Sequence, residues 1–221
     1  MMNTPDDNLS VKFHDGRWIT LSIDRGNRVY GERLFNVDGK EYREWIPNRS
    51  KLSAYLSLGG KFFPFARDTN VLYLGAASGT TSSHISDIVP EGKVYCVEFS
   101  PRTFRDLVSV CETRKNMIPI LGDAVRPDEY RFIIDGDIDI VYQDVSQKDQ
   151  ADILVDNMEC FSARYGMVAV KARSEDVTAS PEKIFDRTCE RLTERGMKII
   201  DVLPLERYEK AHAMIAVERI P

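Results

Sequence analysis

The run Val71-Leu-Tyr-Leu-Gly75-Ala-Ala-Ser-Gly79-Thr-Thr81 decides the fold of this chain. Four apolar residues lead into a glycine, a turn of small residues and a segment that can be helical. An α/β protein brings its backbone up to a nucleotide-like ligand in this way, because glycine tolerates unusual φ/ψ and leaves room for the ligand. Thr80 or Thr81 is expected to cap the helix that follows. Many unrelated proteins carry one such turn, so the signal gains meaning only from the rest of the chain.

The composition is that of a globular protein. The chain has 221 residues, 43% hydrophobic and 29% charged. This length predicts one large domain, or a large one with a small one. No apolar run approaches the roughly 20 residues of a membrane span, and the first residues lack the pattern of a signal peptide. We therefore expect no membrane association and a cytosolic location.

The charge of the chain is unevenly distributed. The net charge is −5, which argues mildly against a freestanding nucleic-acid binder. Residues 1–50 carry eight basic and eight acidic side chains, so the acidic excess lies in the remainder. A nucleic-acid function would need a local basic patch or the help of a partner.

The cysteines predict no metal site. They are widely spaced, without a C-x-x-C pair, and the chain has only three histidines. Buried free thiols are the expected state, and zinc has little support. The four are Cys96, Cys111, Cys160 and Cys189.

The first fifty residues predict a small antiparallel β-unit. Residues 1–8 are expected to be frayed. Short β-type runs then alternate with turn signals, and Asp38-Gly39 favours a tight hairpin. Pro47 marks a boundary, and Ser50–Leu58 is compatible with a short helix. We expect two domains, residues 1–50 and residues 51–221.

Strands and helices alternate from Pro64 onward. Helices are expected to begin near Thr80, Pro101, Gln147 and Pro181, the second and fourth with Ser100 and Ser180 as N-caps. The pattern predicts a doubly wound parallel sheet whose last two strands form an antiparallel edge hairpin. Seven strands in this arrangement resemble the Rossmann-like class I S-adenosylmethionine-dependent methyltransferases. The predicted strands are Val71–Leu74, Lys93–Phe99, Ile118–Leu121, Ile138–Tyr142, Met167–Ala172, Lys198–Leu205 and Ala213–Glu218.

Acidic residues end the second and third predicted strands, where ligands of open α/β sheets bind. Glu98 lies about twenty residues after the glycine turn, where an acid typically bonds ribose hydroxyls. Asp123 is placed to accept from an adenine amino group. Glu98 could instead cap the next helix, and Asp123 could be a turn residue. The turn lacks both G-x-G-x-x-G and a P-loop, so the series favours a nucleoside ligand without phosphates, such as S-adenosylmethionine.

Four polar residues form a candidate catalytic set: Lys51, Asp144, Lys171 and His212. Asp144 and Lys171 end adjacent predicted strands, and the last strand begins at the same edge beside His212. A lysine and an aspartate beside a nucleoside site can orient and deprotonate a hydroxyl. We expect Lys171 to be the base, Asp144 to orient it and Lys51 to be a second cation nearby.

The chain resembles the fibrillarin family over about Lys12 to Glu218. The glycine turn carries the resemblance together with four other runs: Arg43–Leu52, Ile120–Ala124, Asp144–Gln147 and Lys171–Thr178. It is similar to the short archaeal form without a glycine/arginine-rich extension. The resemblance implies an S-adenosylmethionine-dependent 2′-O-methyltransferase acting on rRNA or tRNA. It also implies a box C/D guide RNA, a Nop-domain scaffold protein and a kink-turn-binding protein as partners.

The resemblance extends to individual site residues. The Lys-Asp-Lys-His tetrad of the family matches the four residues named above. Two departures are Ala-Ala-Ser-Gly for Ala-Ser-Ala-Gly in the turn, and Ala211 where an aspartate is common. A basic rim for RNA is expected from Arg43, Arg49, Lys51, Lys171 and Arg173. The turn and the family contacts together give the expected cofactor residues Gly75, Ala76, Gly79, Thr80, Thr81, Glu98, Phe99, Asp123, Ala124, Asp144 and Gln147.

Two other functions remain open at this point. The chain could be a non-catalytic scaffold subunit that keeps the fold and docks through its N-terminal β-unit. It could also methylate protein glutamine or a small molecule. The complete tetrad argues against a scaffold, and its lysines suit a ribose hydroxyl better than an amide.

Overall fold

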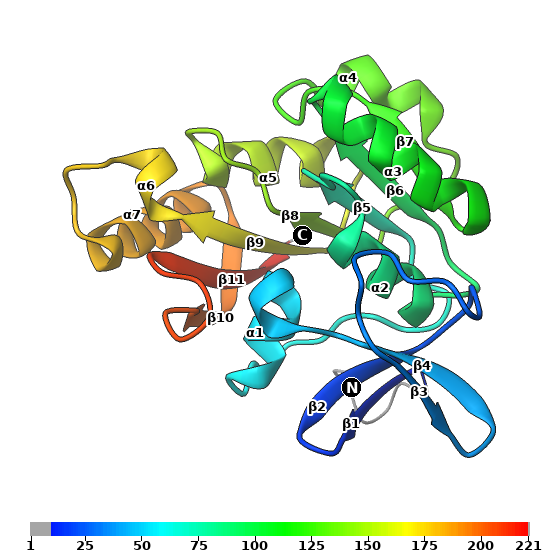
Figure 1. The fold of residues 1–221 in the computed structure, drawn as a ribbon. Coiled ribbons are helices and arrows are strands. Elements are labelled where there is room, and N and C mark those ends of the chain that lie inside the picture. Colours follow the sequence, from blue (N-terminus) through cyan, green and yellow to red (C-terminus); the bar gives the residue numbers. More distant parts are fainter. Residues whose placement is uncertain (1–9, 221) are drawn as a thin grey trace.

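The structure, a computed structural model, describes residues 10–220 and contains the expected seven-stranded sheet. The spatial order is β10-β11-β9-β8-β5-β6-β7, with β11 antiparallel to both of its neighbours (Figure 1). This confirms the class I methyltransferase topology and its antiparallel edge hairpin. Pro119 lies within β7, where an edge strand tolerates a missing N–H donor. The strands are β5 Val71–Leu74, β6 Val94–Glu98, β7 Met117–Leu121, β8 Ile140–Gln143, β9 Tyr165–Lys171, β10 Met197–Pro204 and β11 His212–Arg219.

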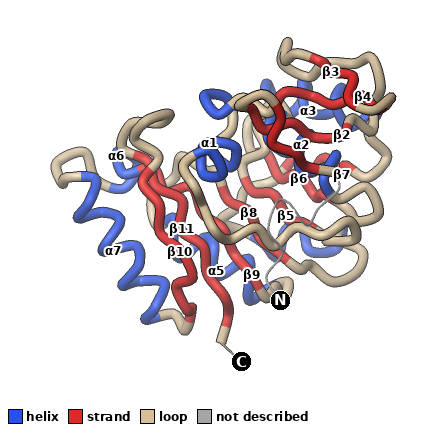
Figure 2. The backbone as a smooth tube through the Cα atoms, turned by 90° about the horizontal axis from the view of Figure 1, so that it is seen from below, coloured by secondary structure: helices blue, strands red, loops and turns tan. Residues whose placement is uncertain are grey.

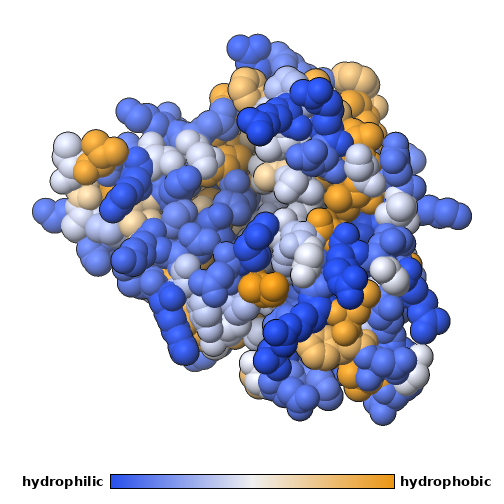
Figure 3. Space-filling model, in the orientation of Figure 1, coloured by the Kyte–Doolittle hydropathy of each residue, from blue (hydrophilic) through white to orange (hydrophobic). Residues whose placement is uncertain are grey.

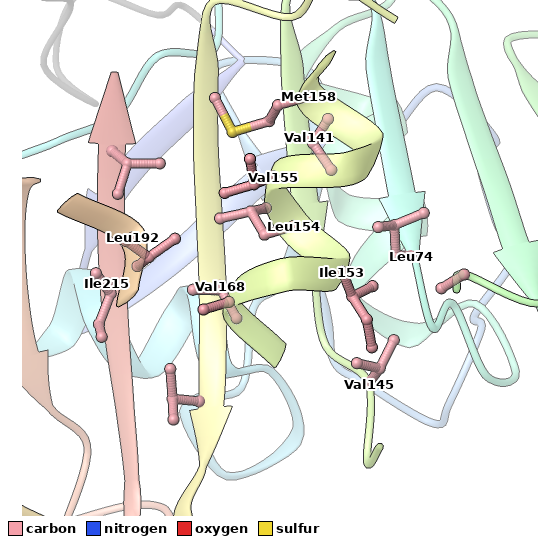
Figure 4. Close-up of a cluster of buried hydrophobic side chains, with 14 of the residues drawn as sticks. Leu74, Val141, Val145, Ile153, Leu154, Val155, Met158, Val168, Leu192 and Ile215 are labelled. Carbon is pink, nitrogen blue, oxygen red and sulfur yellow. The ribbon is translucent and has the colours of Figure 1, made fainter. Parts of the chain in front are cut away.

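Helices cover both faces of this sheet, because successive strand residues point to opposite sides. In β5, Leu72 and Leu74 pack with α5 and α7, whereas Val71 and Tyr73 pack with α1, α2 and α3. Figure 2 shows α7 alongside β10 and β11, and Figure 4 shows Leu154 of α5 close to Val168 of β9. The helices are α1 Lys51–Ser57, α2 Thr80–Ile88, α3 Pro101–Thr113, α4 Pro127–Tyr130, α5 Gln150–Cys160, α6 Ala172–Glu175 and α7 Pro181–Glu194.

The N-terminal β-unit is a four-stranded antiparallel sheet in the order β1-β2-β4-β3. Asp38 and Gly39, with φ of 53° and 76°, form the tight turn between β3 and β4 that the sequence predicts. The sheet packs beside α2 (Figure 1). Its strands are β1 Val11–His14, β2 Arg17–Leu21, β3 Leu34–Val37 and β4 Lys40–Glu44. The expectation for residues 1–8 lies outside the described residues.

Buried ion pairs join the small sheet to α2. Arg43 of β4, fully buried, donates to Glu32 at 2.6 Å and to Asp87 of α2 at 2.7 Å. Arg114 donates to the same Asp87 at 2.7 Å. Burial, Arg43 and Arg114 together depress the pKa of buried His84, which keeps it neutral between the hydroxyls of Thr20 and Tyr30. The expectation that Arg43 belongs to a basic RNA rim is therefore wrong.

Several local predictions also need correction. Gly79, not a threonine, occupies the N-cap of α2, with φ of 90°. Ser100 and Ser180 occupy the N-cap positions of α3 and α7 as predicted, but only the hydroxyl of Ser180 makes a capping bond. The helix expected near Gln147 begins at Gln150. All four cysteines are free thiols, but only Cys96 is buried.

No helix within residues 10–220 is long and apolar enough to cross a bilayer. Figure 3 shows a mainly hydrophilic face on which hydrophobic side chains form separate patches. The structure also contains four short helices that the sequence analysis did not predict: η2 Pro47–Arg49, η3 Arg131–Ile133, α4 and α6.

Candidate active site

The glycine turn lies at the point where the strand order reverses. β5 pairs with β6 on one side and with β8 on the other, and crossovers leave in opposite directions from there. Ligands bind at such switch points, outside the carboxyl ends of the strands. Gly75 ends β5 with φ of 79°, and a Cβ on it would lie 2.5 Å from the Asp144 carbonyl oxygen. Glycine is thus required here for two reasons, its conformation and the close approach of β8.

A cavity of about 370 Å³ opens at this switch point. Of the expected cofactor residues, Gly75, Glu98, Phe99, Ala124, Asp144 and Gln147 line it. Ala77, Val97, Gly122, Val145 and Ser146 also line it, although the sequence analysis did not single them out. Ala76, Gly79, Thr80, Thr81 and Asp123 lie outside this lining.

Glu98 holds the glycine turn and the start of α3 together. One carboxylate oxygen accepts from the Ala77 N–H at 2.8 Å. The other accepts from the Ser100 N–H at 2.8 Å and the Thr103 hydroxyl at 3.0 Å. Glu98 contacts the start of α3 without capping it, since the N-cap is Ser100. These bonds do not exclude a ligand role, because a carboxylate has about four acceptor positions. Ala77 itself has φ of 48°, an unusual conformation for alanine that marks the turn.

Asp123 and Thr81 have intramolecular partners. Asp123 accepts from the Gln147 side-chain amide at 3.1 Å, which connects the end of β7 to the run after β8. The buried Thr81 hydroxyl donates to Ser50 Oγ at 3.0 Å. Thr81 thus contacts the N-cap residue of α1 and does not line the cavity. Asp123 does not line the cavity either, but it is bonded to Gln147, which does.

Lys51 and Asp144 form an ion pair at the mouth of the site. The Lys51 ammonium lies 2.8 Å from both Asp144 carboxylate oxygens, and about a fifth of each side chain is exposed. Lys51 is the first residue of α1, so helix geometry holds its direction, and the backbone N–H of Asp144 is bonded to Leu74 of β5. The pair connects α1 rigidly to the end of β8.

Lys171 has a different partner from the expected one. Its ammonium donates to the hydroxyl of Ser146 at 3.1 Å, not to Asp144. The prediction that Asp144 orients Lys171 is wrong in this structure, because Asp144 is occupied by Lys51. Lys51, the second cation expected near Lys171, is paired with the Asp144 carboxylate and keeps about a fifth of its side chain exposed.

His212 lies directly across the sheet from Lys171. The two residues are paired in the β9–β11 register, so the start of the antiparallel strand meets the end of β9 as predicted. His212 Nδ1 lies 2.8 Å from the Lys210 carbonyl oxygen, which can only accept, so Nδ1 carries the hydrogen. Burial lowers the pKa of His212, and the charge of Lys51 adds to the effect. A neutral ring with its hydrogen on Nδ1 leaves Nε2 as a hydrogen-bond acceptor.

These residues converge on one edge of the sheet, beside the cavity. This edge holds the Lys171 ammonium bonded to a hydroxyl, the neutral imidazole of His212 and the Lys51–Asp144 ion pair. Such a set can bind, orient and deprotonate a hydroxyl. Ser146 and Ala77 are the two missed lining residues that take part in the hydrogen bonds described above. The small residue between Asp144 and Gln147 was the available signal for Ser146.

The fold and the arrangement of the site define a class I S-adenosylmethionine-dependent methyltransferase fold. The profile of one family, Fibrillarin, matches residues 8–220. The chain is 50% identical over 217 residues to the fibrillarin-like rRNA/tRNA 2′-O-methyltransferase of Methanothermobacter thermautotrophicus, covering 95% of this chain and 96% of that one. The chain belongs to the fibrillarin family.

Solved structures of fibrillarins match nearly the whole chain. Aeropyrum pernix fibrillarin in complex with natively bound S-adenosyl-L-methionine is 44% identical, with a TM-score of 0.84 and coverage of 95% of this chain and 98% of that one. A fibrillarin from a fibrillarin/Nop5p complex is 41% identical, with a TM-score of 0.87 and coverage of 96% and 98%.

Proposed function

We propose that this protein transfers a methyl group from S-adenosylmethionine to ribose 2′-hydroxyls of rRNA and tRNA. The observation that carries the proposal is the convergence of Lys51, Asp144, Lys171 and His212 beside one cavity. The named activity of the relative that is 50% identical supports the same reaction.

The residues around the glycine turn fit the cofactor. The Gly75 backbone leaves open a space that a Cβ would fill. The helix after the turn, α2, does not begin with the full glycine fingerprint that binds a pyrophosphate. Glu98 and Gln147 supply polar contacts in a cavity otherwise lined largely by small and apolar residues. We assign cofactor binding to this cavity, where S-adenosylmethionine supplies an electrophilic methyl group on its sulfonium.

The residues of the chain perform the rest of the reaction. Lys171, in its neutral amine form, would take the proton from the ribose 2′-hydroxyl, so that this oxygen can bond to the methyl carbon as the bond between that carbon and sulfur breaks. His212, neutral and with Nε2 free to accept, orients a ribose hydroxyl. The Lys51–Asp144 pair holds α1 against the end of β8 and presents a cation to the RNA backbone beside the ribose.

We propose that the enzyme works in a guide ribonucleoprotein. The solved fibrillarin/Nop5p complex supports a Nop-domain scaffold protein as a partner. The net charge of −5 also suits an enzyme whose substrate is delivered by others. A box C/D guide RNA and a kink-turn-binding protein complete the proposed particle.

A methylation assay with labelled cofactor tests the proposal. Wild-type protein should label RNA when guide RNA and partner proteins are present, and not without them. Lys171→Met should abolish transfer while calorimetry shows cofactor affinity unchanged within about twofold, because Lys171 does not line the cavity. Lys198→Met is the matched control and should remain active, because Lys198 lies near the start of β10, at the end of the sheet away from the site.

Three outcomes would contradict this function. Full activity of Lys171→Met would refute the assignment of the base. Labelling of free RNA without partners would refute the guided reading. Absence of cofactor binding by the wild-type protein would favour the non-catalytic scaffold instead.

A further inference from the structure

We infer that Ser146 is a positioning residue for Lys171, an inference that rests on the proposed function. Among residues 10–220, the Ser146 hydroxyl is the one hydrogen-bond partner of the Lys171 ammonium, at 3.1 Å. The main chain of Lys171 is already held: its N–H donates to the Gln150 side chain at 2.9 Å, and its carbonyl accepts from the same side chain at 3.2 Å. The direction of the long side chain is what Ser146 adds.

Ser146 can direct Lys171 because its own backbone is anchored on both sides. Before it, Asp144 is bonded to Leu74 and paired with Lys51, and Val145 is buried in the core near Ile153 (Figure 4). After it, Gln147 donates to Asp123. A serine in a flexible loop would adjust its position to the lysine. Because the backbone of Ser146 is anchored, its hydroxyl instead fixes the direction of the Lys171 side chain.

The location of Ser146 connects base and cofactor. Ser146 lines the cofactor cavity, and Lys171 does not. One N–H of Lys171 held by Ser146 leaves the other positions of the nitrogen to face a substrate hydroxyl. The hydroxyl of Ser146 therefore determines where the Lys171 ammonium lies relative to the cavity.

Ser146→Ala tests this role, with Ser146→Thr as the conservative variant that keeps the hydroxyl. Loss of one hydrogen bond should lower kcat about threefold to tenfold. KM for RNA and cofactor affinity by calorimetry should stay within about twofold, because the interaction acts on the base and not on binding. Ser146→Thr should recover most of the rate. Ser174→Ala, in α6 and outside the lining of the cavity, is the control and should match wild type.

A second measurement does not depend on methyl transfer. The rate at which each lysine of the free protein reacts with an amine-acylating reagent is followed by mass spectrometry. Lys171 should react at least about twofold faster in Ser146→Ala and at the wild-type rate in Ser146→Thr. Lys51, paired with Asp144, is the internal control and should not change.

Each result decides one of the two proposals. An unchanged kcat and unchanged Lys171 labelling in Ser146→Ala would overturn the role of Ser146 and leave the function intact. Weaker cofactor binding in Ser146→Ala, or no recovery in Ser146→Thr, would also overturn it. A wild-type enzyme without transfer activity would overturn the proposed function, while the labelling result would still report on the Ser146–Lys171 contact.

Discussion

Asp87 is the centre of the joint between the small sheet and α2, and Asp87→Asn should destabilise the protein strongly. Its side chain is fully buried and accepts four hydrogen bonds. Oδ2 accepts from Thr20 at 2.9 Å and Arg43 at 2.7 Å. Oδ1 accepts from the N–H of Ile23 at 3.2 Å and Arg114 at 2.7 Å. Whichever way an asparagine amide is turned, its NH₂ group would face two donors.

The magnitude follows from the charges. Arg43 and Arg114 are balanced by Glu32 and Asp87, and the substitution leaves one buried positive charge uncompensated. Breaking a buried pair in this way costs about 3–5 kcal/mol. For a chain of this size, the melting temperature should fall by about 6–20 °C.

Thermal unfolding followed by circular dichroism measures the effect. The matched control is Glu91→Gln, which removes the same charge from the exposed pair with Arg67 and should cost less than about 1 kcal/mol. A melting temperature of Asp87→Asn within about 2 °C of that of Glu91→Gln would refute the reasoning. It would mean that water or a rearrangement compensates the arginines.

Two further predictions concern the turn and the histidines. Gly75→Ala should weaken cofactor binding at least about tenfold in calorimetry, because its Cβ would meet the Asp144 carbonyl; Gly136→Ala, with a similar φ but open space, should not, and equal loss in both would contradict the steric argument. The melting temperature should fall as pH drops below about 6.5, because the pKa values of His84 and His212 are lowered in the folded protein and the unfolded chain binds more protons there. His212→Asn should reduce this slope between pH 6.5 and 5; an unchanged slope would show that His212 does not contribute.

The fold was largely predictable because its signals are local. Short apolar runs bounded by turn residues, prolines at first helical turns and the Asp38-Gly39 turn each depend on a few neighbouring residues. The order of polar residues at strand ends was predictable too, since topology alone brings Asp144, Lys171 and His212 to one edge.

The partners of individual side chains were not predictable in the same way. Arg43 lies in a run of basic and aromatic residues that suggests a surface, yet Asp87, far along the chain, draws it into the core. Asp144 could have paired with either lysine, and the choice of Lys51 depends on where α1 packs. Such pairings are decided by tertiary distance, on which residue type and spacing give no information.

Ser50 joins the small sheet to the seven-stranded part of the molecule. Its hydroxyl oxygen accepts from the Trp45 ring N–H at 2.9 Å, just after β4, and from the Thr81 hydroxyl at 3.0 Å, at the start of α2. It also caps α1, whose first residue is Lys51. One buried oxygen therefore connects the segment after β4, the helix that begins with Lys51 and the helix that follows the glycine turn. The small sheet thus helps to fix Lys51 relative to the cavity at the switch point, so its position contributes to the geometry of the proposed active site.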